Sequence, residues 1–320
     1  MGMSVALSKK REAEPVKAGF LQRVAVDFGR NKSLYLMVLP VLAYYIVFHY
    51  VPMYGAIIAF KSFTPFKGIW GSEWVGWQNF INFFDSYYFW RILKNTLWIS
   101  INDLIFGFPA PILLALLINE LRNKYFTRTV QTITYMPHFV SLVVICGMIK
   151  DFTLDTGVVN VVLQAFGWKP VTMLNDPGLF VPIYVISDIW QNVGWGSIIY
   201  LATLTSIDPQ LYEAAKIDGA GRLKQTWYVT LPGIMPTIIV LLILRMGRLL
   251  NVGFEKIILL YNPAIYETSD VISSFVYRKG LLEFDWSYGA AVGLFNSVIN
   301  FILLLSANWL SKRVKGSGLW

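Results

Sequence analysis

The sequence predicts an all-α integral membrane protein with six transmembrane helices. Apolar residues make up 56% of the 320-residue chain and charged residues only 14%, whereas soluble proteins carry about 25% charged residues. The apolar residues gather in long runs, and a spanning helix needs about 20 mostly apolar residues. Alternating β-barrel strands do not fit runs of this length and continuity.

Six stretches meet the length requirement, with some polar interruptions. In chain order they are Leu34–Phe60, Asn95–Ile118, Val130–Ile149, Phe180–Leu201, Leu231–Val252 and Ser287–Leu310. The chain is therefore expected to have a basic N-terminal segment (residues 1–33), a transmembrane domain (residues 34–310) and a short tail (residues 311–320).

The N-terminal segment carries apolar residues at helical spacing. They are Val16, Phe20, Leu21, Val24 and Phe28. This pattern predicts a short amphipathic helix on the membrane surface, with a disordered basic tail as the alternative.

The distribution of basic residues indicates the orientation in the membrane. One side would hold both termini and the connections after spans two and four, with 16 basic residues: Lys9, Lys10, Arg11, Lys17, Arg23, Arg30, Lys32, Arg122, Lys124, Arg128, Lys216, Arg222, Lys224, Lys312, Arg313 and Lys315. The other side would hold nine: Lys61, Lys67, Arg91, Lys94, Lys150, Lys169, Lys256, Arg278 and Lys279. Because basic residues concentrate in cytoplasmic loops, both termini are expected in the cytoplasm.

Cysteine and histidine are too scarce for a disulfide or a zinc site. Cys146, the single cysteine, lies inside the third predicted span, so an intrachain disulfide is excluded. His49 and His138 are the only histidines, which excludes Cys₄ and Cys/His metal sites. The sequence therefore predicts no metal in this chain.

A polar segment, "EAAKIDGAGRLKQTWYVTLPGIMP" (Glu213–Pro236), separates spans four and five. Pro209 is well placed near a helix start, and Gly219 and Gly221 permit backbone angles that break a helix. We expect two short helical pieces joined by a bend, with a small-residue face that another protein can approach. A plain interfacial connection is the alternative interpretation.

The order Glu213-Ala214-Ala215, Asp218-Gly219-Ala220 and Leu231-Pro232 resembles the EAA loop of permeases in binding-protein-dependent ABC importers. The resemblance implies a cytoplasmic coupling loop (residues 208–232) that contacts an ATP-hydrolysing subunit. The implied contact residues are Glu213, Ala214, Ala215, Asp218, Gly219, Ala220, Leu231 and Pro232. Trp227 departs from the family pattern, in which Phe is commoner at this position.

The resemblance extends over most of the chain. The stretches "YLMVLPVLAYYIVFHYVPMYGAIIAFKSF" and "WVGWQNF" and the tail "SGLW" resemble carbohydrate-uptake permeases that import large oligosaccharides. The whole sequence is similar to a permease subunit of an alginate importer in the bacterial cytoplasmic (inner) membrane. This implies four kinds of partner: a second homologous permease subunit, two ATP-binding subunits, an extracytoplasmic solute-binding protein and the saccharide.

The sequence contains no motif for catalysis. A GxxxxGK[ST] phosphate-binding loop, a nucleophile elbow, an HExxH motif and a carboxylate pair are all absent. The chain is therefore expected to be non-catalytic, with ATP and Mg bound by the partner subunits.

Polar residues inside the spans predict a hydrophilic pathway, because charges at membrane depth are costly and face a cavity or a partner. The predicted pathway residues are Asp188, Gln191 and Asn192 in span four, Arg245, Arg248 and Asn251 in span five, and Asn296 and Asn300 in span six. The two arginines favour an acidic saccharide. Alternatively, Arg245 or Arg248 pairs with Asp188 or Asp103, or extends outward to the membrane surface.

Two other function classes fit the sequence less well. An ion-coupled secondary transporter would have internal repeats and acidic pairs at the midplane. A membrane enzyme would have clustered carboxylates or histidines at one interface. Neither pattern is present, and both classes leave the Glu213–Pro236 segment unexplained. The predicted function is saccharide import by ATP-driven alternating access.

Overall fold

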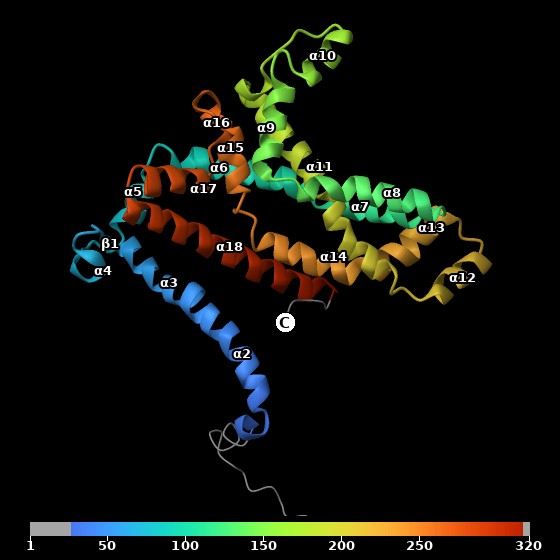
Figure 1. The fold of residues 1–320 in the computed structure, drawn as a ribbon, viewed down its shortest axis with the longest axis horizontal. Helices are drawn as coiled ribbons and strands as arrows, with labels where there is room; N and C mark the ends of the chain where they lie inside the picture. Colours follow the sequence, from blue (N-terminus) through green and yellow to red (C-terminus); the bar gives the residue numbers. More distant parts are fainter. Residues whose placement is uncertain (1–26, 316–320) are drawn as a thin grey trace, which may run out of the picture. The chain divides into compact units, whose positions relative to one another are not determined.

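The computed structural model describes residues 27–315, and this part of the chain is almost entirely helical (Figure 1). Its small sheet consists of β1 (Lys61–Ser62) and β2 (Glu73–Trp74), which pair antiparallel. The chain divides into two units, one ending at Ala56 and the other beginning at Ile57. The all-α fold class is confirmed.

The first unit holds most of the first predicted span. Its elements are α2 (Lys32–Tyr45), the π-helical η1 (Ile46–Tyr50), α3 (Val51–Met53) and the start of the 3-10 helix η2 (Tyr54–Phe60). Together they form an apolar helix, Lys32–Phe60, long enough to cross a membrane. No side chain of α2 is buried, as expected for a helix in contact with lipid or membrane-embedded protein on every side. Most of the segment in which an amphipathic helix was predicted lies outside the described residues.

Spans two and four pack together in the second unit. Span two comprises α6 (Phe89–Asn102), the π-helical η3 (Asp103–Gly107) and α7 (Pro109–Asn119), and span four is α11 (Pro177–Leu204). Pro109 and Pro111 have no N–H to donate, and the ladder widens before them, so that Phe108 N donates to Asp103 O at 3.1 Å. Tyr200 of α11 is buried against Ile112 of α7.

Span three is bent. The predicted straight helix Val130–Ile149 is instead α8 (Lys124–Tyr135), the 3-10 helix η4 (Met136–Phe139) and α9 (Leu142–Thr153), with α10 (Val158–Ala165) after a turn. The helical pieces on either side of the break differ in direction by 99°. Pro137 lacks an N–H, and Val140 and Ser141 adopt extended backbone angles, so the helix cannot continue.

Span five is shorter at its end than predicted. Its elements are α13 (Arg222–Gln225), the π-helical η6 (Thr226–Thr230), α14 (Leu231–Met246) and, beyond a break, α15 (Phe254–Leu260). The prediction that span five continues to Val252 is wrong. After Met246 the α-helical ladder gives way to shorter turns, in which Arg248 N, for example, donates to Arg245 O at 3.0 Å. Leu250 N donates instead to the side chain of another span, Asn300 Oδ1, at 3.0 Å.

Shorter elements complete the second unit. They are α4 (Gly68–Gly71), α5 (Gln78–Phe84), η5 (Met173–Asn175), α12 (Pro209–Ile217), η7 (Pro263–Ile265), α16 (Tyr266–Ser269), α17 (Ile272–Val276) and η8 (Tyr277–Leu282), followed by the long α18 (Trp286–Lys315). The largest core cluster joins α6, α9, α11 and α15 through residues such as Ile99, Ile145, Phe180 and Ile257.

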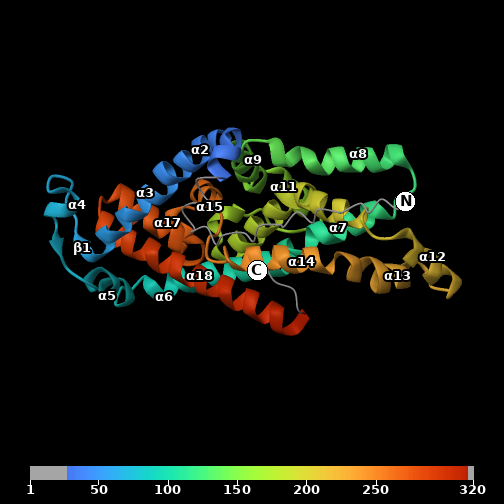
Figure 2. The same ribbon diagram turned by 90° about the horizontal axis from the view of Figure 1, so that it is seen from below.

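Four helices are long and apolar enough to span a membrane, and the bent span three is a fifth candidate. The remaining predicted span, span four, coincides with α11, whose 28 residues extend about 42 Å at about 1.5 Å per residue; the count of six stays a prediction. Within the second unit, Figures 1 and 2 both place α12 and α13 at the end opposite α4 and α5. This separation agrees with the predicted assignment of these loops to opposite membrane sides.

Candidate coupling loop and transport pathway

The predicted coupling loop forms a helix, a bend and a second helix. Pro209 begins α12, and Asp208 caps it by accepting a hydrogen bond from Gln210 N at 2.9 Å. The helix ends at Ile217, and in the turn that follows Gly219 has a φ of +75°, in the left-handed region that favours glycine. Ala220 N then donates to Ala215 O at 2.8 Å and closes the turn.

Two side-chain contacts hold the bent loop as one unit. Gln225 Nε2 donates to Ala220 O at 2.7 Å, and the hydroxyls of Tyr212 and Thr230 lie 3.0 Å apart. The second helical piece is not a separate short helix, because α13 runs without interruption through η6 into α14. A movement of the loop would therefore be transmitted directly to span five.

The eight predicted contact residues divide into exposed and packed positions. The exposed ones are Glu213, Ala214, Asp218, Gly219 and Pro232. Ala215 and Ala220 are half-buried in the bend, and Leu231 packs against the core cluster of α7 and α11. The surface available to a partner is thus formed mainly by α12 and its C-terminal turn.

In span four, the predicted polar face is organised around Asp188. Its Oδ1 accepts a hydrogen bond from Asn192 Nδ2 at 3.2 Å and lies 3.4 Å from Lys256 Nζ. Gln191 is buried. Lys256, which was counted among the basic residues of the outer side, lies in α15 and not in a loop, and its side chain is only 3% exposed. No local pattern distinguishes it, because its burial depends on a carboxylate 68 residues away.

The chain of polar contacts continues to the bend in span three. His138 Nδ1 lies 3.1 Å from Asn192 Oδ1, and since the Asn192 amide nitrogen faces Asp188, this His138 nitrogen is the donor. The His138 ring stacks on Trp195, with centroids 4.7 Å apart and planes 3° from parallel. Asp188 and Asn192 therefore connect the bend of span three to α15.

In span five, one predicted pathway arginine has an internal counter-ion. Arg245 forms an ion pair with Asp103 of η3, which is the alternative that the sequence left open. Asn251 lies within hydrogen-bonding distance of Asn296 at 2.7 Å and of Asn300 at 3.2 Å. The structure therefore unites the predicted asparagines of spans five and six in one cluster, while Arg248 is exposed.

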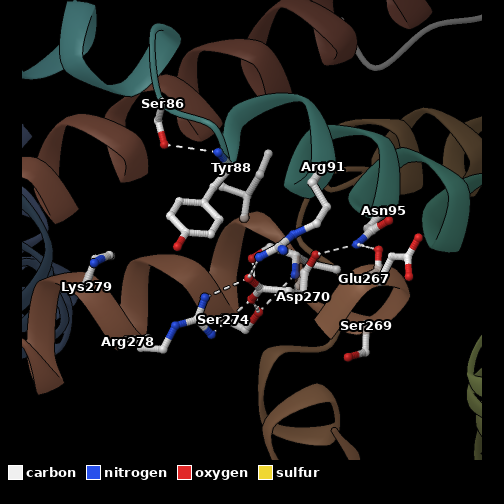
Figure 3. Close-up of polar contacts among 12 residues, drawn as sticks. Ser86, Tyr88, Arg91, Asn95, Glu267, Ser269, Asp270, Ser274, Arg278 and Lys279 are labelled. Atoms are coloured by element: carbon white, nitrogen blue, oxygen red, sulfur yellow. Dashed lines mark hydrogen bonds and ion pairs between the residues drawn. The ribbon is translucent and has the colours of Figure 1, made fainter. Parts of the chain in front are cut away.

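A buried charge cluster links α6 to α16, α17 and η8 (Figure 3). The Asp270 side chain has no exposed surface and receives two hydrogen bonds from Arg278, at 2.6 and 3.2 Å. Arg91 approaches the same carboxylate at 3.5 Å. Burial disfavours the charged Arg278, but its hydrogen bonds to Asp270 and the charge of Asp270 outweigh this and raise the pKa of Arg278. The cluster is a structural joint between segments nearly 180 residues apart.

A cavity of about 1410 Å³ lies beside this cluster, between α6, α11 and α16. Trp90, Arg91, Lys94 and Trp98 of α6 line one wall, and none of the eight predicted pathway residues lines it. Among the described residues, no three His, Cys, Asp or Glu side chains come together to hold a metal ion.

Comparison with known proteins identifies the chain's relatives. Residues 107–316 match the model of the binding-protein-dependent transport system inner membrane component family. The chain is 44% identical to protein LplB of Bacillus subtilis (strain 168), covering 98% of each chain. It is also 44% identical to the polygalacturonan/rhamnogalacturonan transport system permease protein YteP of the same organism, covering 93% of this chain and 94% of YteP.

Two similar solved structures come from alginate importers. One is a bacterial ABC transporter involved in the import of the acidic polysaccharide alginate: the matched chain is 46% identical, with a TM-score of 0.85 and coverage of 92% of this chain and 99% of that chain. The other is a bacterial alginate ABC transporter in complex with a periplasmic protein that holds an alginate pentasaccharide, at 45% identity and a TM-score of 0.86.

These findings support the importer interpretation and give no support to an ion-coupled transporter. The chain is a multi-pass inner-membrane permease subunit of a saccharide ABC importer, and it is not itself an enzyme. It belongs to the binding-protein-dependent transport system inner membrane component family.

Proposed function

We propose that this chain is one half of a permease pair that imports fragments of an acidic polysaccharide. Two ATP-binding subunits, which carry the ATP and Mg, would dock on the cytoplasmic side, and a solute-binding protein would deliver the cargo from outside. The observation that carries the proposal is the exposed, bent α12–α13 loop, which continues directly into span five. ATP-driven closure of the ATPase pair would move this loop and, with it, the span.

An acidic cargo has two lines of support. YteP is named for polygalacturonan and rhamnogalacturonan, and the two solved structures for alginate, so both sets of relatives handle acidic polysaccharides. In addition, Arg248 lies beside Asn251 of the predicted pathway, whose N–H donates to Arg248 O at 2.9 Å, and among the described residues no carboxylate pairs with the Arg248 guanidinium. Uptake of labelled oligogalacturonate or alginate pentasaccharide into proteoliposomes that contain the complete importer tests this cargo.

Purification in mild detergent, followed by mass spectrometry, tests the docking role. The parent chain is expected to co-purify with a protein that carries a phosphate-binding loop. Gly219→Pro should lose that partner, because proline fixes φ near about −65° and Gly219 requires +75°. Gly221→Ala is the matched control: Gly221 has an ordinary φ of −68° and open space around it, so the partner should be retained.

Loss of the ATPase from both variants would show a general disturbance of the chain and would contradict a specific role of the bend. Its absence from the parent preparation would contradict the docking proposal itself.

A further inference from the structure

The break in span five lies at mid-depth of the membrane domain. Ser100 Oγ of α6 donates a hydrogen bond to Leu249 O within the break, and Asn300 Oδ1 of α18 accepts one from Leu250 N. Asn300 is 14 residues from Trp286 and 13 from Arg313, the ends of the candidate span in α18. Ser100 is likewise well inside the candidate span Phe89–Asn119. Residues 247–253 are therefore an irregular segment near the centre of the bilayer.

Side chains of several spans stabilise this irregular segment. Besides the two backbone contacts, Asn251 joins Asn296 and Asn300 in the asparagine cluster. Leu250 is 1% exposed, whereas Asn251 and Arg248 are exposed. Irregular backbone at membrane depth is stable only where protein buries it or where it lines a water-filled cavity. One side of the break is thus buried, and the other is available to a hydrophilic pathway.

Ion pairs flank the break on both sides. Before it, Arg245 pairs with Asp103, whose side chain is 14% exposed; after it, Lys256 pairs with Asp188. Each of these cations has its counter-ion within the chain, so neither has a full charge left for an anionic cargo.

Arg248 differs from both. Within residues 27–315, neither an ion pair nor a side-chain hydrogen bond involves its guanidinium. A charge at membrane depth costs roughly 2.5–3.5 kcal/mol on insertion scales and is retained where it faces a cavity, a partner or a ligand. A guanidinium also matches a carboxylate in geometry, with two parallel hydrogen bonds.

We propose that Arg248 is the residue that binds the carboxylates of an acidic saccharide as it passes the break in span five, while Arg245 and Lys256 are structural cations. This inference rests on the proposed function, because it assigns the specificity for an anionic cargo to one residue of that pathway. It also gives different roles to Arg245 and Arg248, both of which were predicted from the sequence as pathway residues.

The test uses the complete importer in proteoliposomes with its solute-binding protein. Uptake of labelled oligogalacturonate or alginate pentasaccharide, ATPase stimulation by the loaded binding protein, and thermal stability are measured for each variant. Arg248→Gln should lower uptake at least about tenfold, as expected when a charged hydrogen-bonding partner is lost, with the melting temperature unchanged. Arg248→Lys should give uptake between those of Arg248→Gln and the parent, because it keeps the charge but cannot form the two parallel hydrogen bonds.

Arg245→Gln is the matched control three residues away. It should lower the melting temperature, because it leaves Asp103 unpaired in the membrane, and Arg245→Gln combined with Asp103→Asn should recover stability. Parent-like uptake by Arg248→Gln, or a fall in its melting temperature equal to that of Arg245→Gln, would overturn the role of Arg248. If the parent importer takes up only neutral saccharides, the proposed acidic cargo fails and the role of Arg248 fails with it.

Discussion

Asp188 shows how a residue can be predicted correctly as important and still be given the wrong partner. Its position inside an apolar span marks it as functional or paired, and the sequence offered arginines of span five as its counter-ions. The structure pairs it with Lys256 at 3.4 Å, and Arg245 pairs with Asp103. The choice among three cations depends on where the helix breaks, which no single residue reveals.

Lys256→Met tests the stabilising role of this pair. The substitution keeps the side-chain length but leaves Asp188 without a counter-ion. We expect a loss of roughly 3 kcal/mol, the lower end of the range for breaking a buried pair, because the Asp188 side chain is 26% exposed. Thermal unfolding in detergent measures the change.

Lys256→Met combined with Asp188→Asn is the companion variant. Because it removes both charges, it should recover most of the lost stability. A double variant no more stable than Lys256→Met alone would show that the lysine acts through packing and not through its charge.

The helices themselves show which elements the sequence predicts well. Spans with a continuous apolar pattern, such as Trp286–Arg313 and the first span, lie within a few residues of their predicted positions. The breaks at residues 136–141 and 247–253 were missed. Local sequence offers Pro137 as the only strong signal, since the side chains that bond to the backbone of the second break, Ser100 and Asn300, are far away in the chain.

The coupling loop was predicted more completely than the pathway for the same reason. Its bend depends on Gly219, and the start of its first helix depends on Pro209. Both residues can be recognised from the local sequence. The pathway depends on contacts among four spans, and the pairing of Asn251 with Asn296 follows from packing that no motif encodes.

A glycine contact between α8 and α11 supports a prediction about helix packing. A Cβ at Gly194 would overlap the backbone carbonyl of Thr134, so the two helices approach closely only because this residue is glycine. Gly194→Ala should separate α8 from α11, disturb the neighbouring His138–Trp195 stack and lower the melting temperature by several degrees. Thermal unfolding and tryptophan fluorescence of the purified subunit report both effects.

Gly147→Ala in α9 is the control for this substitution. Nothing lies within 4 Å of a Cβ built at Gly147, and alanine favours a helix by up to about 1 kcal/mol over glycine. Stability should therefore stay equal or rise. Equal destabilisation by the two alanines would contradict the packing argument.

At the scale of the whole molecule, the open question is which end faces the cytoplasm. The structure separates α12 and α13 from α4 and α5 within the second unit (Figure 2), and the excess of basic residues assigns the α12 end to the cytoplasm. The single cysteine, Cys146, is buried, so replacing it with serine gives a background suited to cysteine labelling.

In that background, Lys216→Cys in α12 and Lys67→Cys beside α4 place one thiol at each end, both at exposed positions. A membrane-impermeant maleimide added to intact spheroplasts should label the cysteine at position 67 and leave that at position 216 unmodified, whereas after lysis both should react. Intact transport by both variants ensures that the labelled protein is correctly folded. If only position 216 is labelled in intact spheroplasts, the α12 end lies outside the cell, and the topology is the opposite of the one predicted. Because ATP is available only inside the cell, the coupling loop would then be on the wrong side to meet an ATPase, and its docking role would be excluded together with the orientation.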